Sequence, residues 1–386
     1  MHSQKNTLFN NVKMNKQIRK SIGKIHLWLG LASGLVVFIV ALTGSILVFE
    51  EEIDAFIHPE FYKVETVGQS KKPIDYAINT LKEQYAIDTI NRIYTFNDPE
   101  RTVLVMGKNT KGNTYFFAVN PYSGEIISSI EQKKHFFSIV NKLHRSLLLG
   151  ETGKLITGCS CIIFIIILLS GLFLWWPKKL KNLKQRLTIK WDASFKRVNW
   201  DFHSTLGFYS FLFLLIIALT GLTWSFKWFE NSLYYLTDGI AKKPSIKVAN
   251  PAKVAVINDK AFYYESIIEK TNKIYPYQGN IQIRMPNDTV NSILVTKENT
   301  EKRIPNQSSI AYFDRYTAKN IQTKPYESFT KGDKLRRIIY PIHTGSIYGL
   351  PTKIIAFLVC LFAASAPITG FLIWWGRNKK KKQALK

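Results

Sequence analysis

Four histidines stand at matching positions in the two halves of this 386-residue sequence. His26 and His203 each open an apolar run that ends in Ala-Leu-Thr-Gly, whereas His144 and His343 each precede a run that ends in Trp-Trp. Two imidazoles that face each other across a flat macrocycle can supply both axial ligands of a haem iron. The repeated histidines are therefore candidate ligands of haem iron, provided that the fold brings each pair together.

Glycines repeat in the same register and could leave room for such a macrocycle. In each half, one glycine follows the first histidine by four residues, which places both on one helix face. The candidate cofactor-binding glycines are Gly30, Gly207, Gly44, Gly221, Gly171 and Gly370. An alternative interpretation is that these glycines only let membrane helices pack closely, and that the histidines are ordinary interfacial polar residues.

The elements that must position these residues are four runs of 21 to 23 residues that are almost free of charge. They are Leu27–Phe49, Leu155–Trp176, Leu206–Phe226 and Ile354–Trp375. About 20 helical residues cross the hydrocarbon core of a bilayer, so each run predicts a transmembrane helix. The first run is too long for the apolar part of a cleaved signal peptide, and acidic residues follow it instead of a cleavage site.

The net charge of +26 is concentrated beside these runs. Residues 1–26, the 177–202 loop and the tail from Gly376 are strongly basic, so the positive-inside rule predicts that all three are cytoplasmic. A multi-pass protein with both termini inside follows, with residues of about 50–154 and 227–353 outside. Because the excess charge flanks membrane spans, anionic lipid is the expected partner and nucleic acid is not.

Matching histidines, glycines and Trp-Trp pairs indicate a tandem duplication. The predicted fold is therefore an α-helical bundle of four transmembrane helices, with two small external α+β domains. The expected division is a basic tail (1–25), a first span (26–49), an external domain (50–143), an interfacial segment with the second span (144–176), a basic loop (177–202), a third span (203–226), a second external domain (227–342), an interfacial segment with the fourth span (343–375) and a basic tail (376–386).

The two external segments have the same pattern of elements. In the first, the spacing of apolar residues predicts a helix over Pro73–Gln84, then strands over Arg92–Phe96, Thr102–Met106 and Thr114–Val119, and a turn at Asn120–Glu125. In the second, the corresponding elements are a helix over Ala261–Lys270, strands over Gly279–Arg284, Asn291–Thr296 and Ser309–Phe313, a turn at Pro286–Asp288 and a last turn at Asp314–Lys319.

These motifs together resemble a known family. The turn Asn-Pro-Tyr-Ser-Gly-Glu-Ile-Ile after a strand, the helix–strand–strand unit before it, and the His…Gly…Lys…Ser-Gly…Trp-Trp span are similar to the PepSY-associated transmembrane family, over essentially residues 20–378. That family includes iron-regulated membrane proteins and bacterial inner-membrane ferric-siderophore reductases. The resemblance implies a four-helix membrane domain that carries b-type haem, with periplasmic PepSY-like domains.

The predicted topology sorts the histidines into two depths. Parallel repeats are related by an axis along the membrane normal, which brings the two members of each pair together. The inner pair is His26 with His203, and the outer pair is His144 with His343. The glycines that close the Ala-Leu-Thr-Gly runs lie about 26 Å along their helices, at the depth of the outer pair, and those before Trp-Trp lie at the depth of the inner pair. His144 is expected on a short interfacial helix that folds back at Glu151–Gly153.

Two b-type haems, one at each depth, are the expected cofactors. The sequence has no GxGxxG or GxxxxGK[ST] motif, so quinol or a separate cytoplasmic reductase is the expected electron donor. The predicted function is electron transfer across the inner membrane to ferric iron or a ferric siderophore in the periplasm, an oxidoreductase activity whose catalytic residues are not indicated. The alternative is a haem-free, membrane-anchored PepSY protein with a binding or regulatory role. A transporter is disfavoured because the spans lack charged residues.

Overall fold

The computed structural model describes residues 16–242, 263–286 and 292–383. The chain divides into two compact units, and each is described by itself. The membrane unit comprises the described residues up to Ile46, Leu143–Phe226, and those from Ile354 onward; the sheet unit comprises Leu47–Lys142 and the described residues of Lys227–Lys353. Most of the predicted tail 1–25, Ala261 at the start of the predicted helix, and the predicted turn at residues 287–288 lie outside the described residues.

The membrane unit is built from the four expected apolar helices. Within the described part of the chain, these four are long and apolar enough to cross a membrane. They are α2 (Lys16–Val48), α6 (Gly150–Trp175), α9 (Gly207–Ser225) and α13 (Leu350–Gln383). Most of these helices extend beyond the charge-free runs because polar residues continue the backbone hydrogen bonding past the apolar core. Their outer faces remain apolar, as at Leu35, which is 73% exposed.

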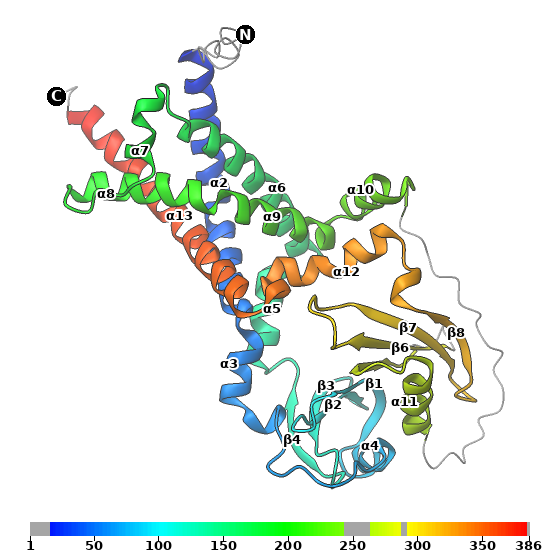
Figure 1. The fold of residues 1–386 in the computed structure, drawn as a ribbon. Coiled ribbons are helices and arrows are strands. Elements are labelled where there is room, and N and C mark those ends of the chain that lie inside the picture. The colour runs from blue at the N-terminus through cyan, green and yellow to red at the C-terminus, as the bar shows by residue number, and fades with distance from the viewer. Residues whose placement is uncertain (1–15, 243–262, 287–291, 384–386) are drawn as a thin grey trace. The chain divides into compact units, whose positions relative to one another are not determined.

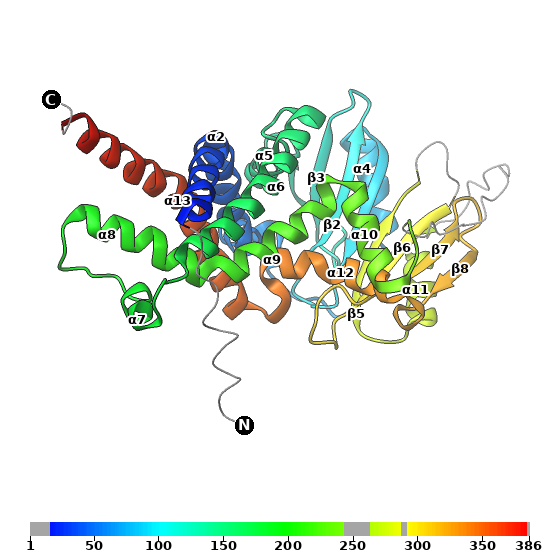
Figure 2. The ribbon, with the colours of Figure 1, turned by 90° about the horizontal axis from the view of Figure 1, so that it is seen from above.

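Close contacts hold the four helices together. Helices α6 and α9 run side by side (Figures 1 and 2). The indole of Trp175 stacks on the ring of Phe208 with centroids 3.7 Å apart, and Leu214 of α9 is buried in a small apolar cluster with Val359 and Ala363 of α13. Dispersion contacts of this kind provide most of the association energy between helices in lipid.

The 177–202 loop contains η2 (Leu180–Asn182), α7 (Leu183–Arg186) and α8 (Phe195–Asp201). From α8 the chain passes into α9 through a π-helical turn, η3 (Phe202–Leu206). Basic side chains satisfy the last carbonyl groups of α6, since Arg19 donates to Leu174 and Trp176 and Arg186 donates to Trp175. Cations are favoured at a helix C-terminus, so part of the basic charge of these segments has a structural role.

The sheet unit contains one antiparallel sheet with the strand order β4-β3-β2-β1-β5-β6-β7-β8. The first half provides α3 (Glu50–Ile57), η1 (Pro59–Phe61), α4 (Ile74–Gln84), β1 (Ile87–Thr95), β2 (Val103–Asn109), β3 (Thr114–Val119), β4 (Ile126–Glu131) and most of α5 (Phe136–Ser146), whose residues from Leu143 onward belong to the membrane unit. The second half provides α10 (Lys227–Asp238), α11 (Tyr263–Ile274), β5 (Gly279–Arg284), β6 (Ser292–Asn299), β7 (Ser308–Asp314), β8 (Asn320–Lys324), η4 (Tyr326–Ser328), α12 (Lys331–Thr344) and η5 (Ser346–Tyr348).

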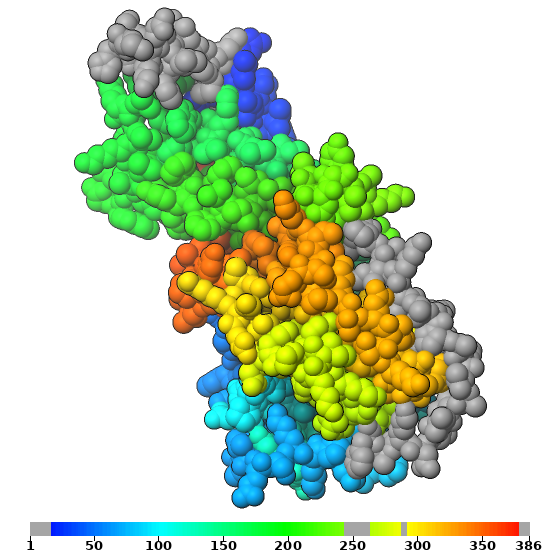
Figure 3. All heavy atoms as spheres, turned by 45° about the vertical axis from the view of Figure 1, so that its right-hand side comes forward, coloured from blue at the N-terminus to red at the C-terminus, as the bar shows by residue number. Residues whose placement is uncertain are grey.

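The two predicted external domains share one sheet, because β1 and β5 pair and join the two halves. Each half alone would leave an unpaired strand edge at this position, and the pairing satisfies both edges. In the space-filling view, the yellow-green residues of the second half pack directly on the cyan and blue residues of the first (Figure 3). Strands β4 and β8 and helices α3 and α10 were not among the predicted elements.

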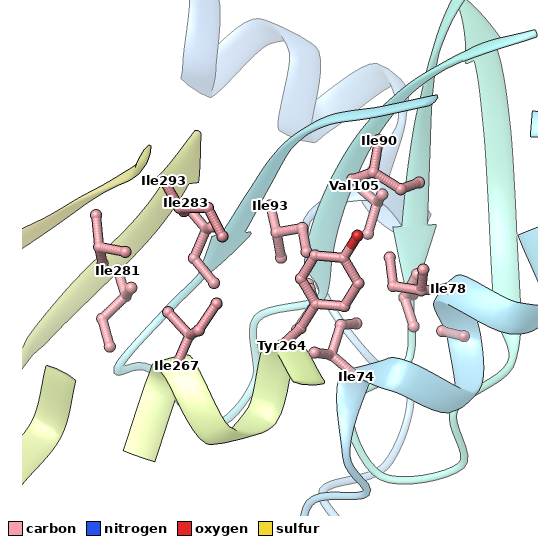
Figure 4. Close-up of a cluster of buried hydrophobic side chains, with 14 of the residues drawn as sticks. Ile74, Ile78, Ile90, Ile93, Val105, Tyr264, Ile267, Ile281, Ile283 and Ile293 are labelled. Atoms are coloured by element: carbon pink, nitrogen blue, oxygen red, sulfur yellow. The ribbon is translucent and has the colours of Figure 1, made fainter. Parts of the chain in front are cut away.

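The centre of the sheet has a regular relation to the sequence. Residues 103–110 align with residues 293–300 without a gap, and the same offset places Ile93 on Ile283. These two residues face each other across the β1–β5 pair, and both are fully buried. Their side chains lie beside Ile267 and Tyr264 of α11 in the shared core (Figure 4). Helices α4 and α11 cover this face of the sheet (Figures 1 and 2).

His144 lies on a short helix before the span, as predicted, but the predicted place where the chain folds back is wrong. His144 lies in the last turn of α5. The helix ends after Ser146, and the chain turns at Leu147 and Leu148, which have positive φ values of 50° and 62°. The next helix, α6, begins at Gly150, so Glu151–Gly153 continue a helix instead of breaking one. The helix α5 begins at Phe136, eight residues before His144, and its buried residues Phe137 and Val140 lie outside the segment that was predicted to be helical.

Candidate cofactor site

His144 is held against helix α2 by its Nδ1 atom. Nδ1 lies 2.9 Å from the carbonyl oxygen of Val40 and 3.2 Å from Oγ1 of Thr43. A carbonyl oxygen can only accept, so Nδ1 carries the proton and donates it. The neutral ring then has its lone pair on Nε2, which is the atom that a metal would take.

His26 and His203 are held in the same way by helices α6 and α13. Nδ1 of His26 lies 2.9 Å from Oγ of Ser170, and Nδ1 of His203 lies 2.8 Å from Oγ1 of Thr369. Each hydroxyl already donates its proton to a carbonyl group of its own helix, three residues earlier. The hydroxyl oxygen therefore accepts from Nδ1–H, and both rings have a lone pair on Nε2.

A glycine directly follows each of these hydroxyl residues and lies under the imidazole ring. A Cβ atom built on Gly44 would stand 3.1 Å from Cε1 of His144. The corresponding distances are 3.3 Å from Gly171 to His26 and 3.5 Å from Gly370 to His203. A Cβ atom at Gly44 or Gly171 would thus press on the imidazole, which would have to move by a few tenths of an ångström.

The three sites share one pattern, which we call the imidazole cradle: a backbone carbonyl, a hydroxyl three residues later, and a glycine one residue after that. For His144 the cradle is Val40, Thr43 and Gly44. For the other two it is formed by Ile167, Ser170 and Gly171 and by Ala366, Thr369 and Gly370. Residues three and four apart share a helix face, so the three groups converge on one ring.

The hydroxyls of the cradle were missed by the sequence analysis, although a signal for them was present. Four of the candidate glycines lie near the end of an apolar run, and each is preceded by serine or threonine. The pairs are Thr43-Gly44, Ser170-Gly171, Thr220-Gly221 and Thr369-Gly370. Only the glycines were interpreted, as contacts for helix packing or as room for the macrocycle. The structure shows that three of them make room for the histidine itself.

The predicted inner pair lies within one unit. His26 belongs to α2 and His203 to the π-helical turn η3, and the two imidazoles are near enough to interact electrostatically. Single π turns occur often at functional sites. A Cβ atom at Gly30 would meet nothing within 4 Å, and one at Gly207 would meet only the ring of Phe362, at 3.8 Å.

His343 of the predicted outer pair lies in α12, which belongs to the sheet unit, whereas His144 and Gly221 lie in the membrane unit. The pairing of His144 with His343 stays a prediction. Within its own unit, α12 is firmly attached to α10, because Arg336 forms an ion pair of 2.7 Å with Glu230 and Asp333 accepts from Tyr234.

The donor atoms fit haem better than a bare metal ion. Among the described residues, no group of three or more histidine, cysteine, aspartate or glutamate side chains could hold a metal ion. Two imidazoles such as those of His26 and His203, each with Nδ1–H fixed by a neighbour and Nε2 available, suit an iron whose other four ligands come from a porphyrin. The cradles therefore fit a bound haem, which is the cofactor that the resemblance implies.

A membrane bundle of four helices, joined to a sheet unit and carrying repeated histidine cradles, defines the class as a multi-pass membrane protein. The chain belongs to the PepSY-associated TM region family, whose model matches residues 24–377. The resemblance seen in the sequence is thereby confirmed. No curated protein matches the chain.

Proposed function

We propose that this protein is a di-haem b electron-transfer protein of the bacterial inner membrane, which reduces ferric iron or a ferric siderophore on the periplasmic side. The observation that supports the proposal most is the imidazole cradle, which recurs at His26, His144 and His203. A neutral imidazole with a fixed Nδ1–H is the form in which histidine binds haem iron. Membership of a family that includes iron-regulated membrane proteins agrees with this.

In the proposed mechanism, the chain's own residues hold and orient the cofactor. His26 and His203 would hold the inner haem, and His144 and His343 the outer one. Bound haem would supply reversible one-electron chemistry at each depth. The cradle hydroxyls keep each imidazole in one tautomer and one orientation, while the apolar faces of the four helices exclude water from the path between the two depths.

The positive-inside rule gives the direction of electron flow in this proposal. The basic loop 177–202 and the basic ends of the chain would lie in the cytoplasm, where quinol or a separate reductase would deliver electrons to the inner haem. The sheet unit would lie in the periplasm and would form the docking surface for the ferric complex. Reduction to ferrous iron weakens binding by hard oxygen ligands and so releases the metal.

The proposal is tested by an absorption spectrum of the full chain, purified in detergent, in its oxidised and dithionite-reduced forms. A b-type spectrum with about two haems per chain is expected. His26→Ala and His203→Ala should each remove the same one of the two haems, because both residues would bind one iron. His58→Ala provides the control, since His58 pairs only with Glu60 and packs against Phe61 among the described residues.

A colourless protein from haem-replete cells would contradict the proposal. The haem-free alternative, in which the sheet unit binds a ligand and the spans only anchor it, would then be preferred. If His26→Ala and His203→Ala removed different haems, electron transfer would stand but the inner pair would be wrong.

A further inference from the structure

The sheet unit contains a pocket of about 420 Å³ that the proposed electron transfer does not use. It lies between α4, α11 and the sheet, so both halves of the unit line it. Its wall includes the apolar side chains of Ile74, Val103, Val119, Ile268 and Ile281. This volume lies within the range of small-molecule sites, which are mostly apolar with a few convergent polar groups.

The most unusual polar group in this pocket is the ammonium of Lys297. Lys297 is only 3% exposed, although lysine is almost never fully buried without a partner of opposite charge. Its Nζ donates to Oδ1 of Asn272 and to the carbonyl oxygen of Tyr275, both at 2.7 Å, and lies 5.1 Å from the centre of the Tyr277 ring. These partners are neutral, and among the described residues no carboxylate forms an ion pair with Lys297.

Burial without a countercharge has an electrostatic consequence. Desolvation lowers the pKa of Lys297, and only the more distant Glu301 acts in the opposite direction. Among the described residues the ammonium donates to two acceptors, so one of its three donors remains for a ligand. An anion at this point would restore the charge balance that the protein groups alone leave incomplete.

The fold itself does not require this lysine. The offset that aligns the two halves places Lys297 on Gly107 and Asn272 on Lys82. Strand β2 therefore forms with glycine at the position where β6 carries the buried lysine. Since the same strand is built without a charge in the first half, Lys297 and its acceptor are specific features of the second half.

The rim of the pocket adds to the positive charge. Lys71 and Lys72 line it and are exposed, and Nζ of Lys72 donates to the carbonyl oxygen of Ser123 at 3.0 Å. Among the described residues that line the pocket, Glu265 is the one acid, and its Oε2 accepts from the backbone N–H of Ile74 at 3.2 Å. Three ammonium groups thus face one carboxylate, which is already used to cap α4.

We propose that this pocket binds a small organic carboxylate with an apolar body. The carboxylate lies against Nζ of Lys297 and displaces no ion pair, while the apolar body contacts Ile268, Ile281 and Val119. Lys71 and Lys72 attract the anion to the rim. The site is independent of the histidine cradles, so its existence does not rest on the proposed electron transfer.

The test uses the full chain in detergent with two probes of nearly equal shape, 2-naphthoate and the uncharged 2-naphthamide. Binding is measured by calorimetry against a blank of detergent micelles. The wild type should bind naphthoate at least about tenfold more tightly than naphthamide, because a hydrogen bond to a charged partner is worth about that factor. Lys297→Met, which keeps the length of the side chain, should abolish this preference and leave naphthamide binding unchanged.

Two further variants make the result specific. Lys82→Met removes an exposed lysine at the position that matches Asn272, and should retain the full preference. Lys71→Gln with Lys72→Gln changes only exposed side chains, so it folds even if Lys297→Met does not, and it should weaken naphthoate binding several-fold at low salt. The proposal is overturned if naphthoate binds no more tightly than naphthamide in the wild type, or if the preference survives unchanged in Lys297→Met and in Lys71→Gln with Lys72→Gln. Haem content, read in the same samples, reports separately on the proposed electron transfer.

Discussion

Asp75 and Glu265 cap the helices of each other's half. The carboxylate of Asp75, at the start of α4, accepts from the backbone N–H groups of Tyr264 and Glu265, each at 2.9 Å, at the start of α11. In return, Glu265 accepts from the backbone N–H of Ile74 at the start of α4. The two acids occupy matching positions in the two halves. An anion at a helix N-terminus satisfies orphan N–H groups, so this exchange fastens the halves together.

The exchange of caps predicts that stability depends on pH. Burial raises the pKa of Asp75 above its ordinary value of 3.8, even though backbone N–H groups oppose the shift, and it raises the pKa of Glu265 in the same way. The folded protein therefore binds these protons more tightly than the unfolded chain. Their contribution to stability is complete below the unfolded pKa and is lost as the pH rises through the folded pKa.

We expect Asp75→Asn to remove the part of this titration that belongs to Asp75, while the part that belongs to Glu265 remains. The thermal midpoint of the sheet unit, followed by near-ultraviolet circular dichroism of the full chain, should fall less for the variant than for the wild type between pH 4 and 7. Asp88→Asn changes an exposed acid of β1 and should follow the wild-type curve. A curve for Asp75→Asn that is parallel to the wild-type curve would show that Asp75 does not titrate in this range.

The central pair of the sheet predicts that the two halves unfold together. Ile93 and Ile283 are both fully buried and face each other where β1 meets β5. Ile93→Ala should lower the free energy of unfolding by about 2–5 kcal/mol, as other truncations of buried isoleucine do. Because the sheet is continuous, amide hydrogen exchange should rise in β5 and β6 as well as in β1 and β2, measured by mass spectrometry on the full chain.

Ile127→Ala is the matched control for this change, since Ile127 of β4 is 39% exposed and should leave exchange nearly unaltered. Faster exchange in β1–β4 alone, with β5–β8 unchanged, would mean that the halves behave as two domains after all.

The sequence predicted the membrane part of this protein better than the sheet part. Apolar runs of sufficient length have almost one solution in lipid, so the four spans follow from composition. The helix that ends at His144 and the edge pairing of β1 with β5 depend instead on contacts between residues far apart in the chain. Nothing in a single strand such as Arg92–Phe96 indicates which other edge it joins.

The candidate site was predicted in the same uneven way. The histidines and glycines were chosen because they repeat, and the structure places three of those histidines against three of those glycines. The hydroxyl groups were overlooked because serine and threonine in a membrane helix usually bond to their own backbone, as Ser170 and Thr369 also do. Only the positions of the rings reveal that the same oxygens accept from imidazole.

The close approach of Gly171 to His26 predicts a steric requirement. A Cβ atom at Gly171 would stand 3.3 Å from Cε1 of the ring, so the branched side chain of Gly171→Val would displace the imidazole from its cradle. We expect this variant to lose about half of the bound haem, measured by the pyridine haemochrome spectrum against protein mass. Gly23→Val is the control, because its nearest neighbour, Leu174, is 3.9 Å away. Full haem content in Gly171→Val would exclude His26 as a ligand in this orientation.

The hydrogen bond from His203 to Thr369 predicts a change in redox potential without a loss of cofactor. An acceptor on Nδ1–H makes the imidazole a stronger donor to iron and favours the ferric form. Thr369→Val keeps the shape of the side chain and removes the acceptor oxygen that lies 2.8 Å from Nδ1. The midpoint potential of one haem, measured by spectroelectrochemical titration, should therefore rise by roughly 20–60 mV. For one electron, about 59 mV is a tenfold change in the equilibrium constant.

Thr223→Val is the control, because it removes a hydroxyl that donates only to its own helix, and it should leave both potentials unchanged. A potential that stays fixed in Thr369→Val, with both haems bound, would mean that the hydroxyl has a packing role and does not tune the ligand.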